Sequence, residues 1–300
     1  MKTKINLHML LILLAASLWG TAGIFVRTIE KYNISEMQIV LLRAFFSAVV
    51  VGLLMLFRDK SLFRIKAKDS VIFAAAGIFS IVMFNFCYYK TMALTSLSVA
   101  AVLLYTAPFF VVIMSVFLFK QPLTVKKCAA CLTAFIGCCL VTGVFSSAQR
   151  IGAAALIYGI LTGFGYSLYT VFSKILLDKG YHSLTITFYT FVFAFFVCLP
   201  ISDIGGIFGA VKQSPIGLLV AVLMALINTV IPYILYTAGL VGVDQSAAPV
   251  IAMIEPVVAT LIGAAFYNET ITAMGVLGII LVLMSVVILN LKRRNSNVRT

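Results

Sequence analysis

The stretch PFFVVIMSVFLFKQPLT, residues 108–124, returns in altered form as PVVATLIGAAFYNETIT at residues 256–272. The two stretches align without a gap at a separation of 148 positions, and each runs from a proline within an apolar segment to a threonine just beyond its end. Upstream, SLSVAAVLLYTAP and DQSAAPVIAMIEP keep the same separation. Any two apolar helices share some likeness, but the common spacing of proline and threonine favours an internal repeat.

The composition places this repeat in a membrane. Of the 300 residues, 63% are hydrophobic and 10% charged, and the mean hydropathy is +1.15, whereas soluble domains carry about 25% charged residues. Apolar stretches long enough to cross about 30 Å of hydrocarbon at 1.5 Å per residue recur along the chain. The expected spans are 7–27, 37–57, 70–90, 97–119, 125–144, 153–173, 184–201, 216–238, 246–267 and 271–291.

Each half of the chain, residues 1–148 and 149–300, then holds five spans. Because five is odd, the second half must cross the membrane upside down relative to the first. Many secondary transporters have this arrangement, and their substrate site lies at the repeat interface near the bilayer midplane. The sequence therefore predicts an all-α integral membrane protein with ten transmembrane helices in two inverted five-helix repeats.

The formal charge of +13 indicates how the chain is oriented in the membrane and does not indicate binding of nucleic acid. The basic residues lie at the ends of the expected spans and form no basic face. With the N-terminus inside, sixteen of the 22 basic residues fall in inside segments: Lys2, Lys4, Arg58, Lys60, Arg64, Lys66, Lys68, Lys120, Lys126, Lys127, Lys174, Lys179, Lys292, Arg293, Arg294 and Arg299. Five fall outside: Arg27, Lys31, Lys90, Arg150 and Lys212. The positive-inside rule predicts a multi-pass protein of the plasma membrane with both termini cytoplasmic.

The chain resembles a known family over nearly its whole length. YYKTMALTSLSVAAVLLYTAPFFVVIMSVFLFKQPLT (88–124) and LYTAGLVGVDQSAAPVIAMIEPVVATLIGAAFYNETIT (235–272) are similar to the two signature halves of EamA-type members of the drug/metabolite transporter superfamily. LWGTAGIFVR (18–27) and LLRAFF (41–46) extend the likeness. The resemblance implies an EamA repeat in each half, with eight helices around a central cavity and the spans 125–144 and 271–291 outside it.

The resemblance also implies secondary transport of small organic metabolites, with export of amino acids or related amphipathic compounds as the expected direction. One position departs from the family pattern. The acidic residue common before the threonine at the end of the fourth helix is Gln121 here, whereas Glu269 keeps it in the second half. We interpret this acid as a cap of a helix end, so its loss has little effect on the expected function.

Glu255 is the one acidic residue expected deep in the bilayer, about 15 Å from the start of its span. Burying a carboxylate there costs free energy unless the group is paired with a cation, protonated or hydrated. One interpretation is a protonatable or substrate-facing coupling group. The other is a structural group that pairs with Arg43, the second deep charge, or bonds backbone freed by Pro256. Arg43 has the alternative of extending outward to the membrane surface.

Four prolines, Pro108, Pro232, Pro249 and Pro256, interrupt the expected spans. Each removes an amide donor and frees a carbonyl one turn back, which is tolerated where the backbone lines a cavity. Prolines are also commoner in membrane helices in general. The matched placement of Pro108 and Pro256 in the two repeats favours hinges.

Aromatic and amide side chains recur near the inner thirds of several spans. They can enclose an amphipathic solute with π faces and a few hydrogen bonds, although Trp and Tyr also gather at membrane interfaces. The expected cavity residues are Trp19, Asn85, Tyr88, Tyr105, Tyr166, Asn228 and Tyr236.

Other functions have less support. The dipeptide Gly-Lys is absent from the sequence, so there is no Walker A motif and transport is not driven by ATP through this chain alone. The six cysteines include CAAC (128–131) in a span without histidine, which indicates apolar filler rather than a metal site, and no cofactor is expected. An intramembrane hydrolase needs two converging carboxylates or several histidine ligands.

We expect a transporter, proton-linked or facilitative, and no enzyme; an intramembrane enzyme and a small-solute channel are the alternatives. The expected partners are the small-molecule substrate and the lipid bilayer, and a homodimer through the peripheral helices is compatible with this arrangement.

Overall fold

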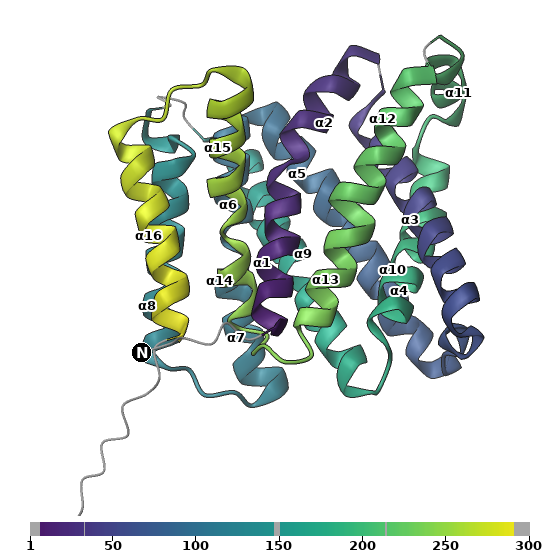
Figure 1. Ribbon diagram of the computed structural model, residues 1–300, viewed down its shortest axis with the longest axis horizontal. Helices are drawn as coiled ribbons and strands as arrows, with labels where there is room; N and C mark the ends of the chain where they lie inside the picture. The colour runs from purple at the N-terminus through teal and green to yellow at the C-terminus, as the bar shows by residue number, and fades with distance from the viewer. Residues whose placement is uncertain (1–6, 33, 147–150, 214, 291–300) are drawn as a thin grey trace, which may run out of the picture.

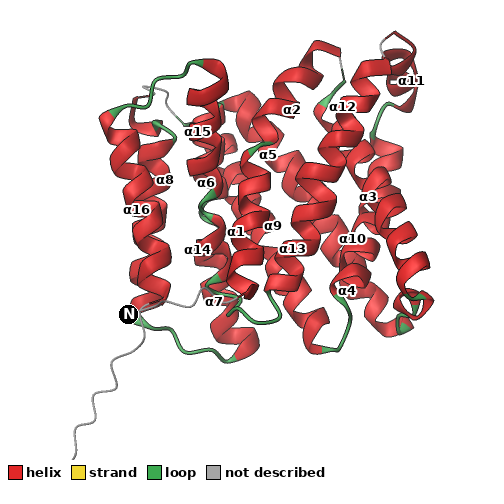
Figure 2. Ribbon diagram, viewed as in Figure 1, coloured by secondary structure: helices red, strands yellow, loops and turns green. Residues whose placement is uncertain are grey.

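The computed structural model describes residues 7–32, 34–146, 151–213 and 215–290, and within these ranges it contains helices and loops but no strand (Figures 1 and 2). The first half comprises α1 (Leu7–Gly20), α2 (Ala22–Ile29), α3 (Glu36–Arg58), α4 (Ser70–Gly77), α5 (Phe84–Leu94), α6 (Leu97–Leu104), α7 (Ala107–Phe119) and α8 (Val125–Val141). The second half comprises α9 (Ala153–Asp178), α10 (Ser183–Cys198), α11 (Ile204–Gln213), α12 (Pro215–Ala225), α13 (Ile231–Gly239), α14 (Ala248–Ala252), α15 (Glu255–Tyr267) and α16 (Ala273–Asn290). Short helical turns complete the chain: η1 (Glu30–Tyr32), η2 (Lys60–Phe63), η3 (Ala67–Asp69), η4 (Ile78–Met83), η5 (Val144–Ser146), η6 (Leu199–Ile201) and η7 (Leu226–Val230). The prediction of an all-α protein is confirmed for the described residues.

Eight helical stretches are long and apolar enough to cross a membrane. They are Leu7–Ile29, Glu36–Arg58, Ala67–Leu94, Leu97–Phe119, Ala153–Asp178, Ser183–Ile201, Pro215–Gly239 and Ala248–Tyr267. Several are built from consecutive helices, such as α6 followed by α7. Each of the eight coincides with one of the spans expected from the sequence.

The two remaining expected spans correspond to α8 and α16, which are shorter. Helix α8 has 17 residues, so it is about 26 Å long at 1.5 Å per residue. The apolar part of α16 is Ala273–Leu289. The two helices pack side by side at one edge of the bundle (Figure 1), where Gly137 and Gly278 let their backbones meet. Ten membrane crossings therefore stay a prediction.

The repeat of 148 positions reappears in the backbone. Helices α7 and α15 end at Lys120 and Asn268, with φ of 53° and 54°, the two positive-φ residues other than glycine in the described part of the chain. After each, the next amide donates to the carbonyl six positions upstream at 3.2 Å. The π-helical turns η4 and η7 also begin 148 positions apart. Two stretches with few identical residues thus share rare backbone features at the same spacing.

The two copies run in opposite directions. In Figure 1 the chain descends through α6 and α7, whereas it rises through the equivalent helices α14 and α15. This is the inverted arrangement that an odd number of spans per half requires. The expected limits of the halves, residues 1–148 and 149–300, stay a prediction, because their boundary lies outside the described residues.

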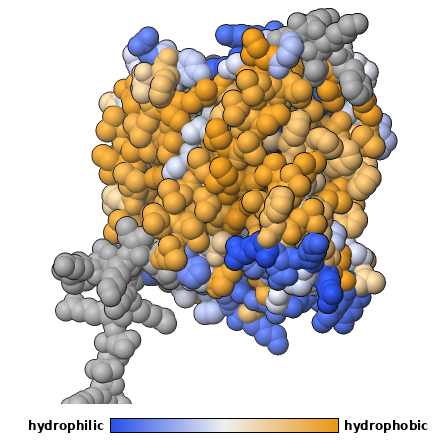
Figure 3. All heavy atoms as spheres, turned by 45° about the vertical axis from the view of Figure 1, so that its right-hand side comes forward, coloured by the Kyte–Doolittle hydropathy of each residue, from blue (hydrophilic) through white to orange (hydrophobic). Residues whose placement is uncertain are grey.

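The outer surface is that of a membrane protein. On the face in Figure 3, apolar residues form a broad band with hydrophilic residues above and below it. Phe117 and Leu219, for example, are exposed, and such a continuous apolar surface is not found on soluble monomers. Several basic residues that were counted for the predicted orientation lie outside the described residues: Lys2, Lys4, Lys292, Arg293, Arg294 and Arg299 of the inside segments, and Arg150 of the outside ones.

Candidate functional site

A cavity of about 610 Å³ lies between the two repeats. Its deep end is formed by Trp19, Tyr105 and Glu255, together with residues of both halves, and its lining continues to Arg27 and Glu269 at the upper end of the molecule in Figure 1. The volume lies within the range of about 300–1,000 Å³ that is usual for small-molecule sites. The position at the repeat interface is the one that the inverted repeat predicts.

Glu255 is placed in this cavity by a break in its helix. Helix α14 ends at Ala252 and α15 begins at Glu255, with Pro256 in the first turn. A proline is tolerated there because the first amides of a helix have no partner within the helix. The positive end of the α15 dipole then favours a carboxylate at its first residue. The pair Glu-Pro thus both starts the helix and directs a charge to the cavity.

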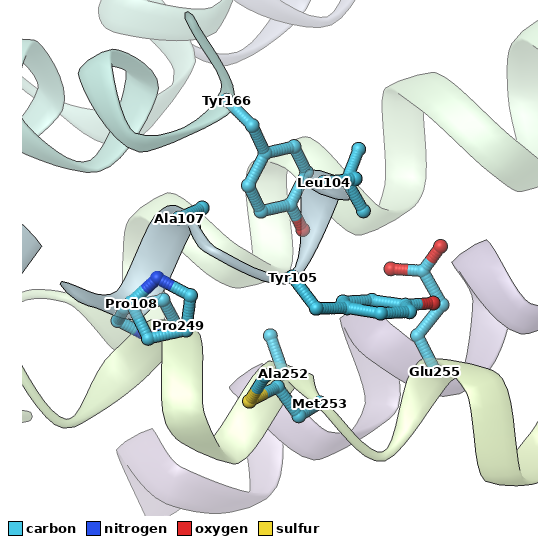
Figure 4. A pocket seen from close by; sticks show the side chains of 9 residues that line it. All are labelled: Leu104, Tyr105, Ala107, Pro108, Tyr166, Pro249, Ala252, Met253 and Glu255. Carbon is cyan, nitrogen blue, oxygen red and sulfur yellow. The ribbon is translucent and has the colours of Figure 1, made fainter. Parts of the chain in front are cut away.

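The Glu255 carboxylate has no hydrogen bond or ion pair with any described residue. Figure 4 shows it extending alongside the ring of Tyr105. Arg43 lines the same cavity, but its Nε donates to Thr229 Oγ1 at 2.8 Å. The Arg43–Glu255 pair and the bond to backbone freed by Pro256, which the structural interpretation required, are both absent from this conformation. Arg43 faces the cavity and does not extend to the membrane surface.

Six of the seven expected cavity residues line it: Trp19, Asn85, Tyr88, Tyr105, Tyr166 and Asn228. The Trp19 ring is the centre of an aromatic cluster, at 6.2 Å from the Tyr166 centroid and 5.4 Å from those of Tyr233 and Tyr236. Tyr236 does not line the cavity: it packs against Trp19, and its hydroxyl is 2.7 Å from Thr170 Oγ1. The role of these residues in binding stays a prediction.

The two asparagines are oriented by the backbone. Asn85 Nδ2 donates to the Ile81 carbonyl at 2.8 Å, and Asn228 Nδ2 donates to the Leu18 carbonyl and to Thr21 Oγ1 at 2.9 Å. A carbonyl oxygen can only accept, so these bonds decide which side of each amide carries the nitrogen. Asn228 lies within η7 and Asn85 follows η4, and such π-helical turns are frequent at functional sites.

Beyond Glu255 lies a second, much smaller pocket of about 10 Å³, which is room for about one water molecule. Figure 4 shows its lining: Leu104, Tyr105, Ala107, Pro108, Tyr166, Pro249, Ala252, Met253 and Glu255. Four of these residues also line the large cavity and so form the boundary between the two spaces: Leu104, Tyr105, Tyr166 and Glu255. This boundary lies where both repeats have a broken helix.

All four expected hinge prolines lie in the first turn of a helical segment. Pro108, Pro249 and Pro256 are the second residues of α7, α14 and α15, and Pro232 is the second residue of α13, just after η7. Each therefore follows an irregular stretch of backbone, where a change in φ and ψ breaks few hydrogen bonds. Whether the segments move about them stays a prediction.

The upper rim of the cavity is held by contacts between the repeats. Arg27 Nη2 lies 2.5 Å from Glu269 Oε1, and the Arg27 guanidinium lies 4.2 Å from the centroid of the Tyr267 ring. Both charged side chains are about half exposed, so the ion pair is accessible from outside. The sequence predicted no role for this pair, although Glu269 is the family acid discussed above.

At the opposite end of the molecule, a polar bridge joins the two repeats. Lys127 Nζ lies 2.7 Å from Asp244 Oδ2, and Gln121 Nε2 donates to Gln245 Oε1 at 3.0 Å. Lys127 Nζ also donates to Gln121 Oε1 at 3.2 Å. The Gln121 side chain therefore connects the repeats and does not cap a helix end. We call Gln121, Lys127, Asp244 and Gln245 the inter-repeat bridge.

The charge of the inter-repeat bridge is favoured by its contacts. Burial opposes ionisation of Asp244, but hydrogen bonds from Lys127 and Ser246 outweigh it and hold the carboxyl pKa below its ordinary value. Ser246 contributes both its hydroxyl, at 2.6 Å, and its amide, at 2.8 Å. These contacts thus favour the ionised form of Asp244 within the bridge.

The EamA-like transporter family matches the chain twice, at residues 6–143 and 153–291. The chain belongs to the EamA-like transporter family. An uncharacterized transporter of Archaeoglobus fulgidus is 29% identical over 92% of this chain and 94% of its own length. The uncharacterized inner membrane transporter YicL of Salmonella typhimurium is 25% identical over 95% and 96%. A solved crystal structure superposes with a TM-score of 0.78 at 16% identity, covering 94% of this chain and 96% of that one, which supports the fold.

In this member of the EamA-like transporter family, the large cavity extends from Arg27 and Glu269 to Glu255 and ends there. The family match and the eight apolar stretches make this a multi-pass membrane protein. Sequence reasoning missed Tyr233, which also lines the cavity. The repeat contained the signal for it, because Tyr233 lies 148 positions after Asn85, an expected cavity residue.

Proposed function

We propose that the protein is a secondary transporter that exports small organic metabolites, amino acids or related amphipathic compounds, by alternating access. The observation that carries the proposal is the asymmetry of the cavity. Its lining reaches the exposed pair Arg27 and Glu269 at one end and ends at Tyr105 and Glu255, and beyond that point the inter-repeat bridge joins the two repeats. A carrier alternates between such a state and its opposite by moving one repeat against the other.

The broken helices provide the moving parts in this proposal. Helix α7 follows a break at Tyr105 and Thr106, and α15 follows a break at Met253 and Ile254. These breaks meet at the small pocket below Glu255. Rearrangement there would join the small pocket to the path beyond it and open the cavity to the other side.

Orientation follows from the charges. The ends of α3, α7 and α9, which carry Arg58, Lys120 and Lys179, lie at the lower edge in Figure 1. By the positive-inside rule this edge is cytoplasmic and the protein lies in the plasma membrane with both termini inside. The conformation described here is then open to the outside, as after release of an exported solute.

Glu255 is the group through which we propose that protons are coupled to transport. It is the acidic residue at the deep end of the cavity, and a buried carboxylate without a partner exchanges its proton readily with a solute or a water chain. A channel is the second candidate function. The inter-repeat bridge disfavours it, since an open channel needs a continuous path.

The test is a comparison of the metabolites in the growth medium of strains that overexpress or lack the protein. An exporter should enrich one class of small organic compounds in the medium of the overexpressing strain and deplete it in the deletion strain. The Tyr105→Ala variant should abolish the enrichment at equal expression. Identical media from all strains would contradict the proposal.

A further inference from the structure

Several hydrogen-bond acceptors of the cavity lining have no partner among the described residues. Both amides use their nitrogens on helix backbone, as described above, so Asn85 Oδ1 and Asn228 Oδ1 remain. Asn228 is 1% exposed, and its Oδ1 has no partner in the described structure. With the Glu255 carboxyl group this makes three acceptor groups without a described partner, of which one can carry a negative charge.

Aromatic rings surround the same end of the cavity. Figure 4 shows the Tyr105 ring beside the Glu255 carboxylate, and Tyr166 lines the same small pocket. Trp19 lines the same cavity, and its ring centroid lies 6.2 Å from that of Tyr166. The faces of such rings attract cations, the indole most strongly. A carboxylate within a set of π faces is therefore an environment suited to a positive charge.

The lack of a positive partner for Glu255 also favours a cationic solute. An unpaired carboxylate away from bulk water is costly, and no described residue compensates Glu255. Arg43 cannot be counted as its partner, since its described bond is to Thr229. A cationic group on the solute would neutralise Glu255, and a hydrogen atom on that group would be available to Asn85 Oδ1.

We propose that the cavity recognises its solute by a protonated primary or secondary amine, which binds at Glu255 between the aromatic rings. The ammonium group would bind the Glu255 carboxylate, and a further N–H donor would be available to Asn85 Oδ1, which belongs to the same lining. The apolar part of the solute packs on Tyr88 and Tyr105. This inference rests on the transport function proposed above and specifies the class of substrate. A carboxylate on the same solute would meet Arg43, whose two terminal nitrogens make no described bond.

Trp19 provides a direct signal for occupancy, because it is the single tryptophan of the sequence and it lines the cavity. The purified protein is titrated with three non-fluorescent probes of equal size class: leucinamide, a cation; leucine, a zwitterion; and N-acetylleucine, an anion. We expect leucinamide and leucine to change the Trp19 emission saturably, and N-acetylleucine to need at least about tenfold higher concentration. Tighter binding of leucine than of leucinamide would support, in addition, the contact between Arg43 and the carboxylate of the solute.

Two variants and a control test the assignment to Glu255. Glu255→Gln should reduce the preference for leucinamide over N-acetylleucine to less than about threefold, whereas Glu255→Asp should retain it because the charge remains. Asp178→Asn removes an exposed carboxylate that pairs with Lys174 at the surface, outside the cavity, and should behave as the wild type. Melting curves of all variants ensure that folded proteins are compared.

The inference is overturned if N-acetylleucine binds as well as leucinamide, if none of the probes changes the Trp19 emission, or if the preference survives in Glu255→Gln. These outcomes are separable from failure of the transport function. Export without amine preference would refute the inference and leave the transporter standing, whereas selective amine binding without any export would support the site and contradict transport.

Discussion

Arg43 and Glu255 line the same cavity from opposite repeats and form no ion pair. Two deep charges in one protein would be expected to neutralise each other, and the sequence alone left that arrangement open. In the structure Arg43 is held by Thr229, and the carboxylate of Glu255 is left to the cavity. This separation makes Glu255 available to a proton or a solute.

The first prediction concerns stability. Glu255→Gln should leave the melting temperature nearly unchanged, because no described group loses a charged partner. Breaking a buried ion pair would instead cost roughly 3–5 kcal/mol. Thermal unfolding of the wild type, Glu255→Gln, Arg43→Gln and the double variant distinguishes the two cases. A large loss in Glu255→Gln that Arg43→Gln restores would show that the pair forms.

The second prediction concerns the pH dependence of transport. Glu255→Gln keeps the shape of the side chain and removes its proton exchange, so net transport should lose its dependence on pH. The rate is measured after pH jumps, at substrate concentrations high enough to offset weaker binding. The titratable groups that sense the charge of Glu255 are Tyr88, Tyr105, Cys138, Tyr166 and Tyr233. A pH profile that persists unchanged in the variant would assign the coupling to another group.

The third prediction concerns the inter-repeat bridge. Asp244 has a lowered pKa in the folded protein, so its stabilising effect is complete above the ordinary value of about 4 and is lost as the pH falls through the lowered pKa. The melting temperature should therefore drop below about pH 4, and less so in Asp244→Asn. Equal acid sensitivity of the two proteins would mean that the bridge contributes nothing to stability.

The fourth prediction concerns the aromatic lining. Tyr88→Ala should raise the substrate concentration for half-maximal transport by roughly tenfold, about 1.4 kcal/mol, through loss of a π face. Phe117→Ala removes an aromatic ring of 78% exposure on the outer surface and serves as the control. Equal half-maximal concentrations for Tyr88→Ala and the control would remove Tyr88 from the binding site.

Much of the fold could be predicted because matched residues of the two repeats recur at a constant separation in the sequence. The offset that joins Pro108 to Pro256 also joins Lys120 to Asn268 at the two left-handed helix ends. The depth of Glu255 followed from counting residues along an apolar run. These features depend on local sequence and on helix length, which a sequence displays directly.

The rest depends on how helices are rotated against each other. Tyr236 and Tyr233 are three positions apart on α13, yet Tyr233 lines the cavity and Tyr236, which packs against Trp19, does not. Likewise, Asp244 and Lys127 come from loops and helices far apart in the sequence, so their bridge could not be expected from either segment alone. Side-chain partners across repeats require the packed structure.

The central claim, that this cavity alternates between the two sides of a membrane, is tested most directly by counterflow. Proteoliposomes are loaded with an excess of the unlabelled metabolite that the expressing strain releases and are diluted into a trace of the labelled compound. The account predicts a transient accumulation of label inside above its equilibrium level, because a carrier returns loaded. Label that only rises to equilibrium, without an overshoot, would contradict alternating access and indicate a channel.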